Sequence, residues 1–178
     1  MWNPIVTDAL LISRIKEVID YQSIRHYSLT TPDLMYGSTG TAIFNYYNYK
    51  LSGNPKSLDT SLTHSQHAID SLTEDTVKNL YLGKGISGIL WGLIHLSHLG
   101  AYDFDVEDVM DEKYFSAYES QSILDMENGD YDHLLGSLGA FMVFMELEKR
   151  NSCEGIILSL SRISKRDKVG LFWEQSPS

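Results

Sequence analysis

A short glycine motif occurs three times along this chain of 178 residues, and its spacing restricts the fold more than any other feature. Each copy holds two glycines separated by two other residues, and an apolar run follows. The copies are Gly37-Ser-Thr-Gly40, Gly85-Ile-Ser-Gly88 and Gly136-Ser-Leu-Gly139. From 37 to 85 is 48 residues and from 85 to 136 is 51, enough for a helix, a connection, a second helix and a return. The spacing predicts an all-α protein made of repeated helical hairpins.

Each glycine pair is expected to begin an inner, largely buried helix of about four turns, because a long apolar run follows it. The three runs stop near Gly53, Gly100 and Asn151. Glycine and asparagine readily adopt the left-handed conformation that commonly follows the C-terminus of a helix. These residues are therefore expected to mark the ends of the three inner helices.

The segments between these runs carry one apolar stripe and one polar face, which is typical of outer helices. In the segment around 58–72, Asn54 and Pro55 favour a helix start, since Asn caps a first turn and Pro is tolerated in it. No stretch alternates with period two for long enough to predict a strand, so no β-sheet is expected. Residues 1–178 are expected to form a single domain. The outer helices are predicted at 5–19, from Pro55 to about 72, at 106–124 and at 154–163.

Composition excludes several classes of protein. Acidic residues number 24 against 14 basic ones, which gives a net charge of −10, and no basic cluster could follow a phosphate backbone. A nucleic-acid partner is therefore not expected. The N-terminus lacks a signal sequence, and no apolar stretch reaches the roughly 18 residues that span a bilayer. Cytoplasmic localisation is expected, and the single cysteine, Cys153, excludes an internal disulfide.

The repeated Gly-x-x-Gly motif at inner-helix starts, together with Leu51-Ser-Gly-Asn-Pro55 after the first helix, resembles the lanthionine synthetase C-like family. The resemblance covers nearly the whole chain. It implies an α/α toroid, in which seven inner helices form a barrel surrounded by seven outer ones. Three repeats would form an incomplete ring, which predicts a partial toroid domain. The activity that the resemblance implies is addition of cysteine thiols to dehydroalanine or dehydrobutyrine in a precursor peptide, as in lantibiotic biosynthesis.

The resemblance also implies zinc in a full-length parent, held by two cysteines and a histidine, one cysteine being part of a Cys-His-Gly motif. None of these ligands can be matched in this chain, because Cys153 is followed by Glu154. The histidine that the family carries in a His-Gly segment of its fourth inner helix has no counterpart either. No metal or other cofactor is therefore expected in this chain, and the chain alone is predicted to be inactive.

Asp132 is the candidate catalytic residue, because the family places an aspartate four residues before a repeat glycine and Asp132 lies four residues before Gly136. The resemblance implies that this carboxylate assists proton transfer during cyclisation. Asp33 lies at the same distance before Gly37, while Tyr81 has that place in the middle repeat. A structural role in the turn or at the helix N-terminus is therefore the alternative interpretation of Asp132. The glycines themselves are expected to be structural.

Two histidine pairs, His64 with His67 and His95 with His98, have a spacing that could place both rings on one helix face. No third metal ligand accompanies either pair in the sequence, so both are interpreted as parts of polar helix faces.

Two other classes of function stay open at this point. One is a non-catalytic helical scaffold or peptide-binding module. The other is a glycosidase of the α/α-barrel class, which would need two facing carboxylates such as Asp132 and Asp33. A precursor peptide is the expected partner. Self-association is expected as well, because the open end of a partial ring would expose apolar surface.

Overall fold

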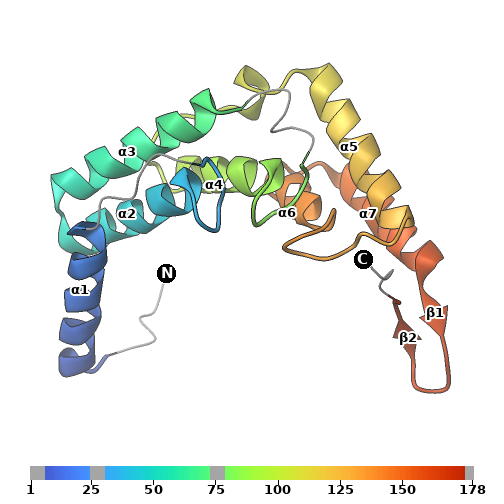
Figure 1. Ribbon diagram of the computed structural model, residues 1–178, viewed down its shortest axis with the longest axis horizontal. Coiled ribbons are helices and arrows are strands. Elements are labelled where there is room, and N and C mark those ends of the chain that lie inside the picture. Colours follow the sequence, from blue (N-terminus) through green and yellow to red (C-terminus); the bar gives the residue numbers. More distant parts are fainter. Residues whose placement is uncertain (1–6, 25–30, 73–78, 175–178) are drawn as a thin grey trace.

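The computed structural model describes residues 7–24, 31–72 and 79–174 (Figure 1). Within these ranges the chain is almost entirely helical, with one short 3₁₀-helix and two strands of two residues. The elements are α1 (Ala9–Ile24), α2 (Ser38–Ser52), α3 (Pro55–Asp70), α4 (Ile86–His98), η2 (Val106–Asp108), α5 (Glu112–Glu127), α6 (Gly139–Glu146), α7 (Arg150–Ile163), β1 (Lys165–Arg166) and β2 (Leu171–Phe172).

The helices form a two-layered arch. Helices α2, α4 and α6 follow one another along its inner layer, and α3, α5 and α7 lie outside them (Figure 1). Helix α2 packs on α3 and α4, and α6 packs on α4 and α7. Helix α1 projects from one end of the arch, and β1 and β2 lie at the other. The fold is therefore a segment of an α/α toroid, built from the helical hairpins that the repeat spacing predicted and arranged as the family resemblance implied.

Two inner helices begin where the glycine pairs predicted, and the third begins later. Helices α2 and α4 each start directly after the first glycine of their pair, at Ser38 and Ile86. Helix α6 starts at Gly139, the second glycine of its pair, and has 8 residues instead of the expected four turns. Before it the chain makes bonds of the tighter i to i+3 type, from Gly139 N to Gly136 O at 3.3 Å and from Ala140 N to Ser137 O at 3.0 Å. The predicted length of this helix was therefore wrong.

Two of the three inner helices, α2 and α4, also end where the sequence predicted. Gly53 and Gly100 follow α2 and α4 with φ of 71° and 77°, in the left-handed region. After α6 this conformation is adopted by Glu148, with φ of 54°, and not by Asn151, which lies in α7. The prediction of a stop at Asn151 was wrong because the shorter α6 ends earlier and a side-chain-bearing residue takes the strained position.

The outer helices lie close to their predicted ranges. Helix α3 begins as expected, with Pro55 in its first turn and the Asn54 side chain accepting the Lys56 N–H at 3.0 Å. The helix expected at 106–124 is divided into η2 and α5, because Asp111 caps a new start by accepting the Tyr114 N–H at 2.9 Å. Helix α7 starts four residues before the predicted 154. Helix α1 starts at Ala9, and the first residues of its predicted range lie outside the described part of the chain.

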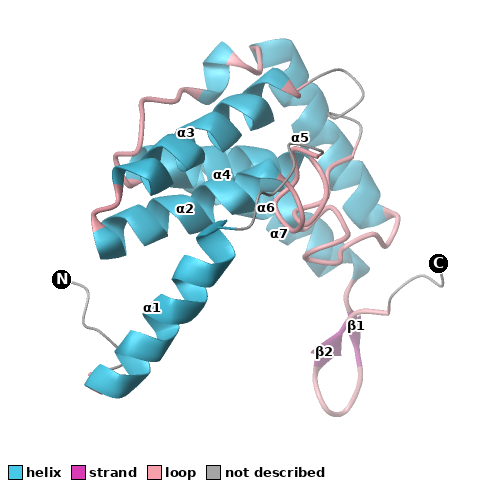
Figure 2. Ribbon diagram, turned by 60° about the vertical axis from the view of Figure 1, so that its left-hand side comes forward, coloured by secondary structure: helices cyan, strands magenta, loops and turns pink. Residues whose placement is uncertain are grey.

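A small antiparallel hairpin contradicts the expectation that the chain has no β-sheet (Figure 2). Lys165 pairs with Phe172 and Arg166 with Leu171. Strands of two residues are too short to produce a detectable alternation in the sequence. The Trp173 indole N–H donates to the Leu160 carbonyl at 2.8 Å, which attaches the end of the hairpin to α7.

The main core lies where α4, α5, α6 and α7 meet. Tyr118 of α5 and Phe144 of α6 are both fully buried, with ring centroids 5.4 Å apart in an edge-to-face arrangement. The Tyr118 hydroxyl lies 2.8 Å from the Ser87 Oγ of α4, so the aromatic core also has its polar atom satisfied. Burial raises the pKa of Tyr118. Among the described residues, no helix has the length and apolar character needed to cross a membrane.

Candidate functional site

The loops that precede the three inner helices lie side by side and are joined by backbone hydrogen bonds. The Met35 N–H donates to the Gly83 carbonyl at 3.0 Å, and the Gly83 N–H donates to the Leu134 carbonyl at 2.8 Å. All three residues lie two positions before the first glycine of their repeat. Equivalent backbone atoms therefore connect one repeat to the next, and they form a rim at one end of the inner layer, which we call the repeat rim. The linkage was not evident from the sequence, although the glycine register predicts which residues would be equivalent.

The repeat glycines are required by close packing at this rim. A Cβ placed on any of the six would come within 3.0 Å of a neighbouring atom. In the first repeat the obstacle is backbone, with the Thr31 carbonyl oxygen 2.4 Å from a Cβ on Gly37. This geometry agrees with a structural role for Gly37, Gly40, Gly85, Gly88, Gly136 and Gly139.

Asp132 lies in the third loop and its carboxylate holds the turn. Its Oδ1 accepts the backbone N–H of Leu134 at 2.8 Å and that of Leu135 at 2.7 Å. Asp33 has the same task in the first loop, where its Oδ1 accepts the Tyr36 N–H at 2.7 Å. The two aspartates differ in exposure, because Asp33 is 7% exposed while Asp132 is open to solvent. Only Asp132 is therefore accessible to a substrate.

The hydrogen bond from Leu134 distinguishes the third loop from the first two. In the first two loops the equivalent N–H groups, of Met35 and Gly83, bond to the neighbouring loop. In the third loop the Leu134 N–H bonds to Asp132 instead. The Asp132 carboxylate thus accepts the Leu134 N–H, whereas the equivalent N–H groups of the other two loops bond to a neighbouring loop.

A second carboxylate close to Asp132 adds negative charge to this loop. Burial raises the pKa of Asp130, and the nearby charges of Asp125 and Asp132 raise it further. The Asp130 backbone carbonyl also accepts the Ser137 N–H at 3.1 Å, so this residue is fixed at the start of the turn. Neighbouring carboxylates of this kind can take up and release protons, which is the chemistry that acid–base catalysis needs.

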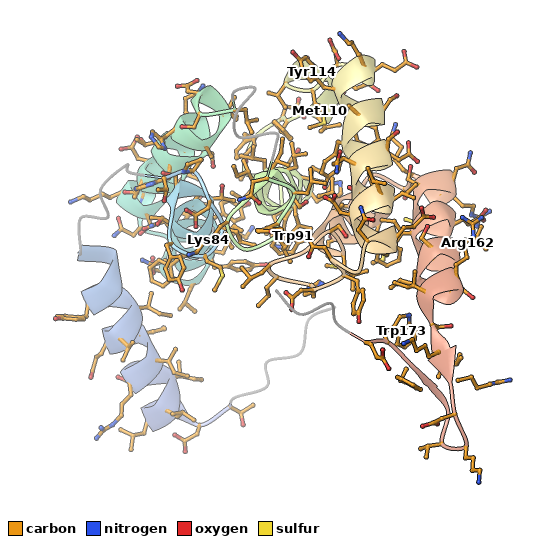
Figure 3. The ribbon with its side chains drawn as sticks, turned by 45° about the vertical axis from the view of Figure 1, so that its right-hand side comes forward. Lys84, Trp91, Met110, Tyr114, Arg162 and Trp173 are labelled. Carbon is orange, nitrogen blue, oxygen red and sulfur yellow. The ribbon has the colours of Figure 1, made fainter. Side chains whose placement is uncertain are left out.

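Aromatic and basic side chains lie on the concave side of the inner layer, where Figure 3 shows Lys84 and Trp91. The Lys84 Nζ lies 5.1 Å from the centre of the Tyr36 ring, across the first two loops. Further along α4, Trp91 stacks on His95 with centroids 5.1 Å apart and planes 10° apart. The His95 Nε2 is 3.0 Å from the Tyr47 hydroxyl of α2.

Each histidine of the two pairs has a partner within the fold. His95 contacts Tyr47 and Trp91, whereas His98 lies 3.3 Å from the Glu146 carboxylate of α6. His64 and His67 both point at Ser38, whose Oγ is 3.3 Å and 2.8 Å from their Nδ1 atoms. Across residues 7–24, 31–72 and 79–174, no three His, Cys, Asp or Glu side chains come together as a metal site would need.

The zinc that the resemblance implies does not fit the described residues. Cys153 packs against the main core, and burial raises the pKa of its thiol, which opposes formation of the thiolate that zinc requires. No histidine or carboxylate cluster accompanies it within the described ranges.

The comparison with protein families agrees with the architecture. The family model described as lanthionine synthetase C-like protein matches residues 28–175, which include all three glycine pairs. No curated protein and no solved structure gives a match to the chain. The glycine register, the two-layered arch and the extent of this match lead to one conclusion: the chain belongs to the lanthionine synthetase C-like family.

Proposed function

We propose that this chain is the N-terminal portion of a lanthionine synthetase C-like peptide cyclase. Its reaction would be thioether formation, in which a cysteine thiol of a precursor peptide adds to a dehydroalanine or dehydrobutyrine. The family match over most of the chain and the toroid segment support this proposal. The main observation in favour of the site is that Asp132 is exposed at the repeat rim, while Asp33, at the equivalent position of the first loop, is buried.

The proposed role of Asp132 is to move a proton. The sulfur forms a bond to the β-carbon of the dehydroamino acid, the electron pair of the double bond moves toward the carbonyl, and the α-carbon then takes a proton. The thiol loses a proton in the same reaction, so no oxidant or reductant is needed. A carboxylate held by two backbone N–H groups has a fixed position from which it can carry this proton.

The remaining catalytic groups would lie outside this chain. Since the described residues do not fit a zinc site, we propose that zinc belongs to the full-length parent and that the 178-residue chain is inactive alone. The thiol-activating chemistry would come from that part of the parent.

The test uses a peptide that carries one cysteine and one dehydroalanine. Cyclisation leaves the mass unchanged but removes the free thiol, so alkylation followed by mass spectrometry measures the reaction. The isolated chain should leave the thiol free, and a protein extended through any downstream reading frame after Ser178 should consume it. Consumption by the isolated chain, or a stop codon directly after Ser178, would refute the proposal.

The role of Asp132 is tested in the extended protein by Asp132→Asn. We expect the rate to fall by roughly 10²- to 10⁴-fold, which is the usual contribution of a general acid or base. Asp33→Asn is the matched control, since Asp33 has the same turn contact but is buried. Equal losses in both variants would indicate that Asp132 acts only in the turn.

The second candidate is a non-catalytic peptide-binding module. It is favoured by Tyr47, which is 49% exposed and contacts the half-buried pair of Trp91 and His95, since accessible aromatic side chains suit peptide recognition. The glycosidase alternative has no such support, because Asp33 is 7% exposed and is bonded to its own loop. Binding of the precursor peptide by an extended protein that never consumes thiol would favour the module.

A further inference from the structure

A cavity of about 820 Å³ lies in the outer part of the arch, between the start of α5 and the turn that joins α6 to α7. Its volume falls within the roughly 300–1,000 Å³ that is common for small-molecule sites. None of the residues of the repeat rim lines it. The inference drawn from it is therefore independent of the proposed cyclase activity.

The floor of this cavity is apolar and firmly packed. Val106 and Met110 line it and are only 7% and 3% exposed. Figure 3 shows Met110 beside the start of α5. Phe115, also in the lining, packs edge-on against Phe144 of the main core with centroids 5.8 Å apart. A rigid floor of this kind preserves the distance between the two walls.

The walls carry opposite charges that do not neutralise each other. On the side of η2 and α5 lie Glu107, Asp111, Glu112 and Glu119, and on the other side lie Lys149 and Arg150, beside Glu148. The Lys149 Nζ lies 5.1 Å over the Phe115 ring and not on a carboxylate. Within the described ranges, neither Glu119 nor Arg150 forms an ion pair.

The N-terminus of α7 opens into the second wall. Arg150, Asn151 and Ser152 are the first three residues of this 14-residue helix, all three line the cavity, and no side chain caps the helix start. The N–H groups of a first turn attract anions. Ser152 adds a second observation, because the residue is only 5% exposed and yet it lines the cavity. This hydroxyl is a polar group of the cavity lining that a ligand carboxylate could accept from.

We infer that this cavity binds a short zwitterionic ligand of the class of a peptide with a free ammonium and a free carboxylate. The ammonium lies against the carboxylates of the α5 wall, and the carboxylate lies at the start of α7, near Arg150 and the Ser152 hydroxyl. A ligand with a single charge would leave one wall uncompensated. We name the site the α5–α7 cavity.

Four matched probes test the charge pattern, with binding to the full chain measured by titration calorimetry. They are triglycine, its C-terminal amide, its N-acetyl form and the form blocked at both ends. We expect triglycine to bind at least about tenfold more tightly than each blocked form, since loss of one charged contact costs roughly that factor. Equal affinity for triglycine and either singly blocked form would overturn the inference, as would no binding of triglycine.

Single substitutions connect each wall to one end of the ligand. Glu119→Gln should lower the affinity for triglycine and its amide about 3- to 10-fold and leave the affinity for the acetylated form unchanged. Arg150→Gln should lower the affinity for triglycine and the acetylated form by a similar factor and leave the affinity for the amide unchanged. Glu154→Gln and Arg166→Gln are the matched controls, because they remove the same charges from exposed positions outside the cavity. If the controls weaken binding as much as the cavity variants, only the overall charge acts and the site is refuted.

Ser152→Ala provides a readout that does not depend on charge. We expect weaker triglycine binding, by about 3- to 10-fold, because the variant removes a hydrogen-bond donor from the cavity lining. Thermal unfolding of every variant shows whether the fold is intact. Unchanged affinity in a folded Ser152→Ala chain would exclude the hydroxyl from the site and overturn the proposed position of the carboxylate.

Discussion

Asp33 and Asp132 occupy equivalent positions in the first and third repeat loops and accept backbone N–H bonds there, yet Asp33 is 7% exposed and Asp132 is open to solvent. The two aspartates thus make the same kind of turn contact, one in a buried and the other in a solvent-exposed environment. In the first loop the adjacent Met35 N–H is bonded to Gly83, whereas in the third loop the equivalent Leu134 N–H is bonded to Asp132 itself.

Substitution of these two aspartates should show how much burial adds to the stabilisation that their shared turn contact provides. We expect Asp33→Ala to lower the free energy of unfolding by about 2 kcal/mol, because the Tyr36 N–H loses a charged acceptor that is itself buried. Asp132→Ala should cost only about 1 kcal/mol, since water can replace an exposed carboxylate. Urea unfolding followed by circular dichroism measures both values. A larger loss for Asp132→Ala would contradict the assignment of burial.

Gly83 lies between two neighbouring loops, so an added methyl group there should be destabilising. A Cβ on Gly83 would lie 2.7 Å from the Met35 Sδ and 3.2 Å from the Leu134 carbonyl oxygen. We expect Gly83→Ala to cost about 1–3 kcal/mol, as overpacking usually does. Met35→Ala should recover part of this loss in the double variant, because it removes the closest atom. Strictly additive effects in the double-mutant cycle would argue against the contact.

Glu148 has a backbone conformation that glycine tolerates better. Its φ is 54°, while Gly53 and Gly100 fill the corresponding positions after the other inner helices. We expect Glu148→Gly to raise the free energy of unfolding by about 1 kcal/mol, the approximate cost of the left-handed region for an ordinary side chain. Gly53→Ala is the reverse control and should destabilise by a similar amount. The midpoint of urea unfolding gives both results.

The stability of the chain should fall in mild acid because of His64. Burial and the neighbouring His67 lower the pKa of His64 in the folded state below its ordinary value of 6.5. The unfolded chain therefore binds a proton more readily, so stability decreases as the pH falls below about 6.5 and levels off below the folded pKa. We expect His64→Gln to flatten this slope in unfolding experiments between pH 5 and 8. An unchanged slope in that variant would exclude His64 as its cause.

The two ends of the arch should promote self-association, which we propose as a property of the isolated chain. Ile157 and Leu158 of α7 are 54% and 56% exposed, and Leu10 and Val18 of α1 are 68% and 60% exposed. Exposed apolar surface of this kind favours contact with other chains. Sedimentation velocity should show concentration-dependent association, which Ile157→Lys with Leu158→Lys should reduce. A monomer at all concentrations that binds no hydrophobic dye would contradict the proposal.

The sequence by itself determined the helical repeat, its period and the start of α2 and α4, because glycine spacing and apolar runs are local properties of the chain. It also predicted the capping role of Asn54, and the family resemblance drew attention to Asp132 and to Asp33 at the equivalent position. It did not determine the short α6 or the left-handed Glu148, since both depend on how the third loop packs.

Only the tertiary structure decided which of the two aspartates is exposed and which backbone groups join Met35, Gly83 and Leu134. It also brought the α5 carboxylates of Glu112 and Glu119 opposite the start of α7 at Arg150, although these segments are distant in sequence. These features depend on the distances between repeats, and such distances arise only when helices from different hairpins pack against one another.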